Sequence, residues 1–475
     1  MLEGSFLFFM LAFLLVGFSS VLVRRKQSAD YLLAGRSLPP ALAGLSAVAT
    51  NNSGYMFIGM IGFTYSTGLG AVWLMIGWIF GDFLISLLVH RRLRRATEEF
   101  ESLTYPSLLA NWYGQNHLGV RVLVALIAVV FLGIYSAAQF SAGSKALHVI
   151  FGWEQRLGAL LGAGMVLFYC FSGGLRASVW TDAAQSMVML TGMLVMVWIT
   201  ISRFGGLDGS WEALNGVSDT FMNLFPPNLA FGAAGPGLFV IGWIFAGFGV
   251  IGQPHIMVRF MSLDSEDSMR RARFYYYSWY TSFYTLALVV GLMSRLILPE
   301  IANFDVTEDT ELALPTLAAE LLPGVLAGLV LAGLFAATIS TADSLILSCS
   351  AAISQDLLPK RWQSFGRTRL VTLGMILLAL TIALVSDESV FVLVLYAWSG
   401  LGAAFAPLML LYALGRQPPQ WLAMAMIAVG PTVVLGYQWL DPRIVDTIYE
   451  ILPGMLAGGL VYLVGSWLGT RRAGQ

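Results

Sequence analysis

The sequence predicts an all-helical integral membrane protein, and three observations carry this prediction. Of the 475 residues, 57% are apolar and only 11% are charged, against roughly 45–50% and 25% in an ordinary soluble domain. The apolar residues also form long runs, and a helix needs about 20 such residues to cross the hydrocarbon core of a bilayer. Finally, 50 Gly and 14 Trp suit close helix packing and anchoring at membrane interfaces. A soluble globular protein is excluded.

About 13 apolar runs fit membrane-spanning helices when they are divided at charged clusters and at stretches rich in Gly, Pro, Asn or Asp. They are 5–23, 40–65, 70–89, 122–147, 156–173, 178–201, 235–257, 275–297, 323–352, 370–386, 389–414, 420–438 and 450–469. The first run has neither a charged leading region nor a small-residue cleavage site, so we expect a retained helix rather than a signal peptide. The polar connections between runs are too short to fold alone. Residues 1–475 are therefore expected to form a single transmembrane domain.

Positive charges predict the orientation of these spans. All but five of the 26 Lys and Arg residues fall on one side, in clusters such as 91–95 and 360–369. The five on the other side are Lys145, Arg156, Arg203, Arg295 and Arg443. Because cytoplasmic loops carry the excess of Lys and Arg, we expect the N-terminus outside, the C-terminus inside and a multi-pass protein of the cell (inner) membrane. The formal net charge of −1 offers no basic surface to nucleic acid.

Two predicted spans are interrupted by polar or Gly-rich runs. The run Ala49-Thr50-Asn51-Asn52-Ser53-Gly54 lies near the middle of span 40–65, and residues 247–254 interrupt span 235–257. Five spans separate the start of the first broken span from the start of the second. An odd number reverses the direction in which the chain crosses the membrane. This arrangement predicts an inverted repeat with halves at about 40–201 and 235–414, each opening with a broken helix, and extra helices at 5–23, 420–438 and 450–469. The alternative is that Gly and Pro merely kink both helices.

A third polar cluster lies in span 323–352. Ser340, Thr341 and Ser344 share one face of the predicted helix, and Asp343 lies beside them. Hard cations prefer oxygen ligands, which these hydroxyls and a carbonyl freed at the first helix break, such as that of Ala49, would provide. The alternative is that the hydroxyls only bond to their own helix or join neighbouring helices.

Two acidic residues lie inside apolar spans. Asp182 lies about one turn into span 178–201, where a carboxylate is by default a functional-site hypothesis, although its side chain could instead extend to the interface. Asp82 lies within reach of the cluster Arg91 to Arg95 along the sequence, so we expect it to be structural. The two cysteines, Cys170 and Cys349, fall in apolar runs and are expected to be core residues.

Five segments of the sequence together resemble the sodium/solute symporter family, and bacterial sodium/proline symporters most of all. They run in order and at near-family spacing from about residue 1 to 415. They are Asp30-Tyr31-Leu32-Leu33-Ala34-Gly35-Arg36-Ser37-Leu38, Trp180-Thr181-Asp182, Gly252-Gln253-Pro254-His255, Val258-Arg259-Phe260-Met261 and Ser340-Thr341-Ala342-Asp343-Ser344. The resemblance implies a LeuT-type fold of five plus five helices and sodium-driven import of a small organic solute by alternating access.

The resemblance also implies site residues. The family's sodium site corresponds to the backbone carbonyls of Ala49, Asn52 and Ala337 and the hydroxyls of Ser340 and Thr341. A second cation or proton site corresponds to Asp182, with Asp343 and Ser344 beside it. The residues expected to bind the solute are Asn51, Ser53, Gly54, Tyr55, Tyr135, Ala246, Val250 and Gln253.

This chain departs from the proline symporters at both helix breaks. Those proteins carry Asp followed by Met where this chain has Asn51 and Asn52, and Trp and Tyr where it has Ala246 and Val250. A wider and more polar solute pocket is the expected consequence. We therefore expect an amino acid such as proline, or another carboxylate, with its anionic group near the half-helix ends at Gly54 or Gly249.

Other classes of function are less well supported. The sequence has no H-E-x-x-H, G-x-S-x-G or G-x-x-x-x-G-K-[ST] motif, so we expect a transporter rather than an enzyme. No cofactor is expected apart from sodium as the coupling ion, and the expected partners are the solute, sodium and the bilayer. Proton coupling through Asp182 or Asp343, and a transporter-like sensor, remain the alternatives.

Overall fold

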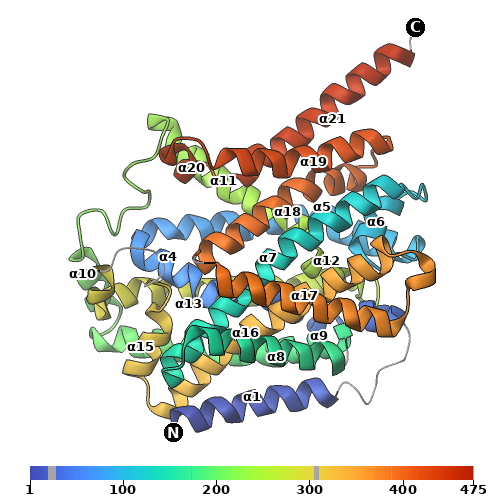
Figure 1. Cartoon of the computed structure of the whole chain (residues 1–475). Helices are drawn as coiled ribbons and strands as arrows, with labels where there is room; N and C mark the ends of the chain where they lie inside the picture. Colours follow the sequence, from blue (N-terminus) through green and yellow to red (C-terminus); the bar gives the residue numbers. More distant parts are fainter. Residues whose placement is uncertain (20–27, 173, 304–309, 387, 474–475) are drawn as a thin grey trace.

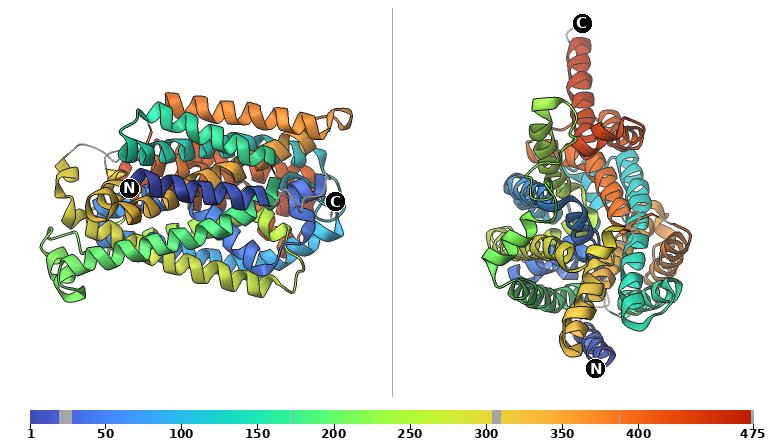
Figure 2. Two further views of the ribbon diagram at one scale, coloured as in Figure 1. Left: turned by 90° about the horizontal axis from the view of Figure 1, so that it is seen from below. Right: turned by 90° about the vertical axis from the view of Figure 1, so that its left-hand side faces the viewer.

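The computed structural model describes residues 1–19, 28–172, 174–303, 310–386 and 388–473. Within these ranges the chain forms helices, and its one strand-like feature is the isolated bridge between Leu38 and Leu263. The long helices lie side by side across Figure 1, and Figure 2 shows the same bundle from below and along its length. The N-terminus lies at the end of the bundle that carries α10, α15 and α20, and the C-terminus at the end that carries α6 (Figure 1). The ends therefore lie as an odd number of crossings requires, and which of them faces the cytoplasm stays a prediction.

Helices or broken helices coincide with all the predicted spans. The first half of the predicted repeat comprises α3 (Pro40–Phe57), α4 (Gly59–Thr67), α5 (Val72–Glu99), α7 (Leu118–Phe151), α8 (Gln155–Ser172) and α9 (Gly174–Arg203). The second comprises α11 (Gly235–Phe248), α12 (Pro254–Met261), α13 (Met269–Ile297), α16 (Gly324–Ala351), α17 (Phe365–Val385) and α18 (Val390–Ala413). Outside the repeat lie α1 (Leu2–Ser19), α2 (Ser28–Leu33), α19 (Gln420–Tyr437) and α21 (Ile451–Ala473). Short connecting helices are α6 (Tyr105–Asn111), α10 (Leu207–Asn215), α15 (Ala313–Leu321) and α20 (Pro442–Thr447).

Several predicted boundaries differ from the helix ends. Helix α5 continues ten residues beyond its predicted end at 89, because its arginines are good helix formers and the buried Arg94 donates to the carbonyl of Leu263 at 2.7 Å. The last residues of two predicted spans, 20–23 of span 5–23 and 173 of span 156–173, lie outside the described residues. The basic residues Arg24, Arg25 and Lys26, which follow the first span, also lie outside them. In the described part, 11 helices are long and apolar enough to cross a membrane.

The helix contacts are reciprocal between the two halves. Helix α5 packs on α11, and the equivalent helix of the second half, α13, packs on α3. In the same way α18 packs on α7, and its equivalent in the first half, α9, packs on α16. The equivalent helices α7 and α16 pack on each other. Glycines permit the closest approach, since a Cβ at Gly81 would lie 2.0 Å from the Ile244 carbonyl oxygen and one at Gly247 would lie 2.2 Å from that of Trp78. This exchange of partners is the packing that an inverted repeat requires.

Large apolar side chains cover the outside of the bundle. Examples are Leu7 on α1, Leu160 on α8, Leu377 on α17 and Leu463 on α21, each about half or more exposed. Such a surface is unstable in water and suits lipid. The chain is a multi-pass membrane protein.

Candidate functional site

The first helix break lies where the sequence predicts it. Within α3, Ser53 has φ 50° and ψ −170°, a left-handed conformation that costs a residue other than glycine about 1–3 kcal/mol. Helix α7 holds the break in place: the Tyr135 hydroxyl donates to Ser53 Oγ at 3.2 Å, and the Gly54 amide donates to Gln139 Oε1 at 2.9 Å. Strain that is held by specific contacts is typical of a binding site.

The second break also lies where it was predicted. Helix α11 ends at Phe248, a tight turn follows at residues 249–252, and Gln253 is extended before Pro254 begins α12. The freed polar groups find partners on neighbouring helices: Tyr105 donates to the Ile251 carbonyl at 2.7 Å, and Gln253 Nε2 donates to the Trp398 carbonyl at 3.0 Å. Both halves of the repeat therefore begin with a discontinuous helix.

The face of helix α16 that carries the hydroxyls of Ser340 and Thr341 lies against the first helix break. Thr341 donates to the Thr50 carbonyl at a long 3.4 Å, whereas the buried Ser340 hydroxyl makes no hydrogen bond of normal geometry within the described part of the chain. Asn52 donates to the Val48 carbonyl, which leaves its buried Oδ1 without a partner. Buried oxygens of this kind normally have a partner, and an alkali cation would supply one. Ala49 and Ala337 are buried too, and the assignment of all five ligands stays a prediction.

Asp182 lies inside the bundle rather than extending to the interface. Its side chain is fully buried, and Oδ2 accepts hydrogen bonds from Ser46 at 2.6 Å and Thr50 at 3.3 Å. The same oxygen pairs with Arg259 at 3.3 Å, while Oδ1 has no partner in the described residues. Asp182 is therefore part of a buried polar network that joins α3 and α9.

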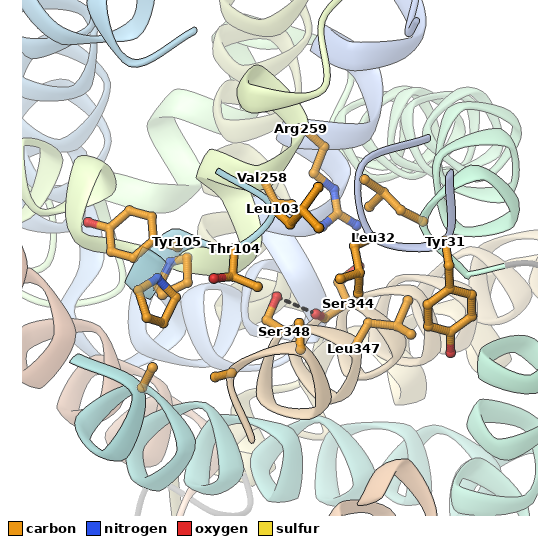
Figure 3. A pocket seen from close by; sticks show the side chains of 16 residues that line it. Tyr31, Leu32, Leu103, Thr104, Tyr105, Val258, Arg259, Ser344, Leu347 and Ser348 are labelled. Carbon is orange, nitrogen blue, oxygen red and sulfur yellow. Dashed lines mark hydrogen bonds between the residues drawn. The ribbon is translucent and has the colours of Figure 1, made fainter. Parts of the chain in front are cut away.

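Arg259 is the centre of this network. From the sequence it was placed in a family-like segment and its charge was counted on the cytoplasmic side, but no partner and no role in the site were assigned to it. It is fully buried and donates to the His255 carbonyl at 2.5 Å, to Ser46 at 3.2 Å, to Ser178 at 3.1 Å and to Ser344. Figure 3 shows its side chain pointing from α12 toward Ser344. Both residues line a cavity of about 30 Å³. The available signal was an arginine within an otherwise apolar helix.

The three residues expected at a second cation site lie near the Arg259 guanidinium but have different direct partners. Ser344 lies against Arg259 and donates to the Ser340 carbonyl at 2.8 Å. The carboxyl of Asp343, in contrast, accepts from Cys170 Sγ on α8 at 2.9 Å. Asp182 and Ser344 thus meet at the guanidinium, and Asp343 contacts another helix. Cys170 and Cys349 are free and buried, as expected.

The residues expected to bind the solute lie around the two breaks. Buried atoms without partners in the described residues include Tyr55 Oη, Gln139 Nε2 and Gln253 Oε1, and they offer both donors and acceptors. The amides at Gly54 and Gly249, the half-helix ends near which an anionic group is expected, are both hydrogen-bonded in this conformation. Gln139 occupies the first amide, and the second bonds within its own helix.

The wider pocket expected at Ala246 and Val250 stays a prediction. Both residues are fully buried, and the indole of Trp398 donates to the Ala246 carbonyl at 2.9 Å. The Trp398 ring also packs on Trp78, with 4.9 Å between the centroids. A tryptophan from α18 therefore bonds to the backbone of α11 at this small residue.

Asp82 has different partners from those predicted. It is fully buried, and it accepts hydrogen bonds from the hydroxyls of Tyr276 and Tyr277, each at 2.7 Å. Tyr276 in turn accepts from Asn51 Nδ2 at 2.5 Å. The expected association with the arginine cluster is wrong. Arg91 pairs with Asp267 and Glu266, Arg95 with Glu266, and Arg94 with Glu98.

Towards the opposite end from the cavity in Figure 3 lies a larger cavity of about 730 Å³. Its walls combine the aromatic rings of Phe63, Trp243 and Phe391 with the carboxyls of Asp446 and Glu450. The Phe63 and Phe391 rings stack with centroids 4.8 Å apart, and Phe391 also stacks on Tyr55 at 5.5 Å. Aromatic rings therefore separate this cavity from the first helix break.

Glu311 connects the helices on that side of the bundle. Its carboxyl pairs with Lys145 of α7 at 2.5 Å and accepts from the Val390 and Phe391 amides, at 3.2 and 2.9 Å, where α18 begins. A carboxylate at a helix N-terminus is favourable. This single side chain holds α18 against α7.

Comparison with known proteins identifies relatives along nearly the whole chain. The model of the sodium:solute symporter family matches residues 31–416. A sodium/proline symporter of Salmonella typhimurium is 31% identical over 458 residues, with 93% of this chain and 88% of the relative covered. The high-affinity proline transporter PutP of Bacillus subtilis is 29% identical over 452 residues, with 94% and 93% covered.

Solved structures show the same fold. A Na⁺-coupled sialic acid symporter in a substrate-bound outward-open state has a TM-score of 0.78 at 18% identity, covering 98% of this chain and 97% of the other. The nucleobase-cation-symport-1 family transporter MHP1, in a closed conformation, has a TM-score of 0.58 at 15% identity, covering 93% and 96%. The predicted LeuT-type fold is confirmed, whereas the exact number of spans stays a prediction. With a family model covering residues 31–416, the chain belongs to the sodium:solute symporter family.

Proposed function

We propose that the protein imports a small organic solute together with sodium by alternating access, with an amino acid, and proline first, as the solute. The observation that carries the proposal is the meeting of the first helix break with the hydroxyl face of α16, where the buried Ser340 oxygen has no partner of normal geometry. Relatives that are sodium/proline symporters support both the ion and the solute.

Sodium would bind between α3 and α16, at the hydroxyls of Ser340 and Thr341 and the carbonyls of Ala49, Asn52 and Ala337. Because α3 is broken and α16 is continuous, a cation held by both fixes the angle of the first break. The same break carries the solute-binding residues, including Tyr55, so ion binding prepares the solute site. This linkage is the coupling that symport requires.

The two cavities support alternating access to that site. The larger one lies beyond the aromatic rings of Tyr55 and Phe391, and the smaller one lies beside Arg259, on the other side of the breaks. Because rings and side chains separate both from the centre, this conformation resembles an occluded state. The larger cavity lies on the side of the bundle that is predicted to face the outside of the cell. We propose the inner membrane of the cell as the location of the protein.

Uptake of radiolabelled proline into proteoliposomes tests the proposal. An inward sodium gradient should drive accumulation, and an equal potassium gradient should not. Accumulation driven by a proton gradient without sodium would instead support proton coupling through Asp182. If a thermal-shift screen of amino acids, carboxylates and sugars finds a ligand but the proteoliposomes do not accumulate it, the transporter-like sensor becomes the better explanation.

A further inference from the structure

Asp82 is a buried carboxyl that has no role in the transport mechanism proposed above. It lies on α5 at the close contact with α11, where a Cβ on Gly247 would lie 2.5 Å from the Asp82 amide nitrogen. Its side chain is fully buried, and its described partners are two phenols rather than a cation. A carboxyl in the membrane interior without a cationic partner is costly, which marks it as a functional-site candidate.

The phenol of Tyr276 connects Asp82 to the first helix break. A phenol has one proton, and Tyr276 donates it to Asp82 Oδ2. The remaining Tyr276 lone pairs can only accept, so the group facing them must be a donor. That group is Nδ2 of Asn51, at 2.5 Å.

The carboxyl therefore decides which end of the Asn51 amide faces α13. As long as Asp82 accepts the Tyr276 proton, the NH₂ of Asn51 points to the phenol and its Oδ1 is left to act as an acceptor. If residue 82 could donate instead, Tyr276 could turn its proton to Asn51, and the amide could reverse. Asn51 lies two residues before the non-helical Ser53, within the proposed solute site.

We propose that Asp82 is a positioning residue that acts through Tyr276 to set the donor and acceptor polarity of Asn51 at the solute site. The inference rests on the proposed function, because it assigns Asn51 to that site. Asp82 itself is two hydrogen bonds away from the break. Its effect is to keep an acceptor, rather than a second donor, available to the solute or its ion.

The chain supplies a matched control for the connection. Tyr277 donates to the other Asp82 oxygen at 2.7 Å, from the same helix and with the same chemistry. No hydrogen bond from Tyr277 to Asn51 is described, and only Tyr276 makes that link in the described residues. Tyr276→Phe breaks the connection, whereas Tyr277→Phe weakens the surroundings of Asp82 and keeps it.

The experiment measures sodium-dependent binding of radiolabelled proline by purified protein, together with thermal stability. Asp82→Asn and Tyr276→Phe should each weaken proline binding at least tenfold, and Tyr277→Phe should leave it within about twofold of wild type. The double variant Asn51→Asp with Asp82→Asn should recover binding relative to Asp82→Asn. In the double variant the side-chain amide at position 82 donates to the Tyr276 hydroxyl, and that hydroxyl donates to the carboxylate at position 51. Both hydrogen bonds between positions 82 and 51 are then made again, in the reverse direction.

The outcomes separate this inference from the proposed function. If wild-type protein does not bind proline in sodium, the proposed function with proline as solute fails first. If wild-type protein binds and Asp82→Asn and Tyr276→Phe bind equally well, the positioning role is refuted alone. Equal losses in Tyr276→Phe and Tyr277→Phe would also refute it, because a purely structural carboxyl predicts that result. Should Asp82→Asn fail to fold, Tyr276→Phe and the double variant still decide the question.

Discussion

Replacing Ser340 with alanine should affect folding stability and sodium binding in opposite directions. In this conformation the Ser340 hydroxyl is buried without a hydrogen bond of normal geometry to any described residue, and such a group costs about 1–3 kcal/mol when no ion is bound to it. Its removal should therefore leave the free energy of unfolding unchanged or raise it. The hydroxyl is also a proposed ligand of sodium, and its loss should weaken sodium binding.

The size of the effect follows from the same numbers. A lost oxygen ligand worth about 1–3 kcal/mol corresponds to roughly a 5- to 150-fold weaker affinity. At a sodium concentration of 100 times the wild-type Kd, binding stabilises the folded state by about 2.7 kcal/mol. A tenfold weaker site leaves about half of that stabilisation at the same concentration.

Thermal unfolding of purified protein in sodium and in potassium measures both effects. Ser350 provides the control, because it is buried on the same helix and donates to the Ile346 carbonyl at 2.7 Å. Ser350→Ala should lower stability slightly in both salts and keep the full sodium-dependent shift. An unchanged sodium-dependent shift in Ser340→Ala would refute the assignment of this hydroxyl as a ligand.

Three further predictions test other parts of the molecule. Arg259→Gln leaves the buried Asp182 unpaired and should destabilise the protein by about 3–5 kcal/mol; adding Asp182→Asn should recover most of the loss of Tm, and no recovery would argue against the ion pair. Glu311→Gln should lower Tm in the same way, because it leaves a buried lysine of α7 unpaired, and a wild-type Tm would contradict this. A membrane-impermeant thiol reagent applied outside should label Arg443→Cys and not Arg92→Cys; the reverse pattern would overturn the orientation. Native cysteines should not interfere with that labelling, since both are buried.

Properties that depend on neighbouring residues could be predicted from the sequence. Apolar runs of sufficient length predicted every long helix of the repeat, because a helix in lipid satisfies its own backbone groups and needs no distant partner. The breaks near Ser53 and Gln253 were predicted for the same reason, since clusters of polar and glycine residues interrupt an otherwise apolar run. The second broken span begins five spans after the first, and this odd number, which reverses the direction of crossing, predicted the inverted repeat; the reciprocal packing of α5 on α11 and α13 on α3 agrees with it.

Tertiary structure alone decided how charged and polar side chains are paired. Asp82 was assigned to arginines close in sequence, but it bonds to Tyr276, 194 residues away. Arg259 was counted among the charges of the cytoplasmic side, and the structure shows that it is buried and pairs with Asp182. The indole of Trp398 on α18 donates to the carbonyl of Ala246, a residue 152 positions earlier. Hydrophobicity and spacing determine which segments enter the membrane, but the partner of each buried polar group depends on which helices meet, and that information is distributed over the whole chain.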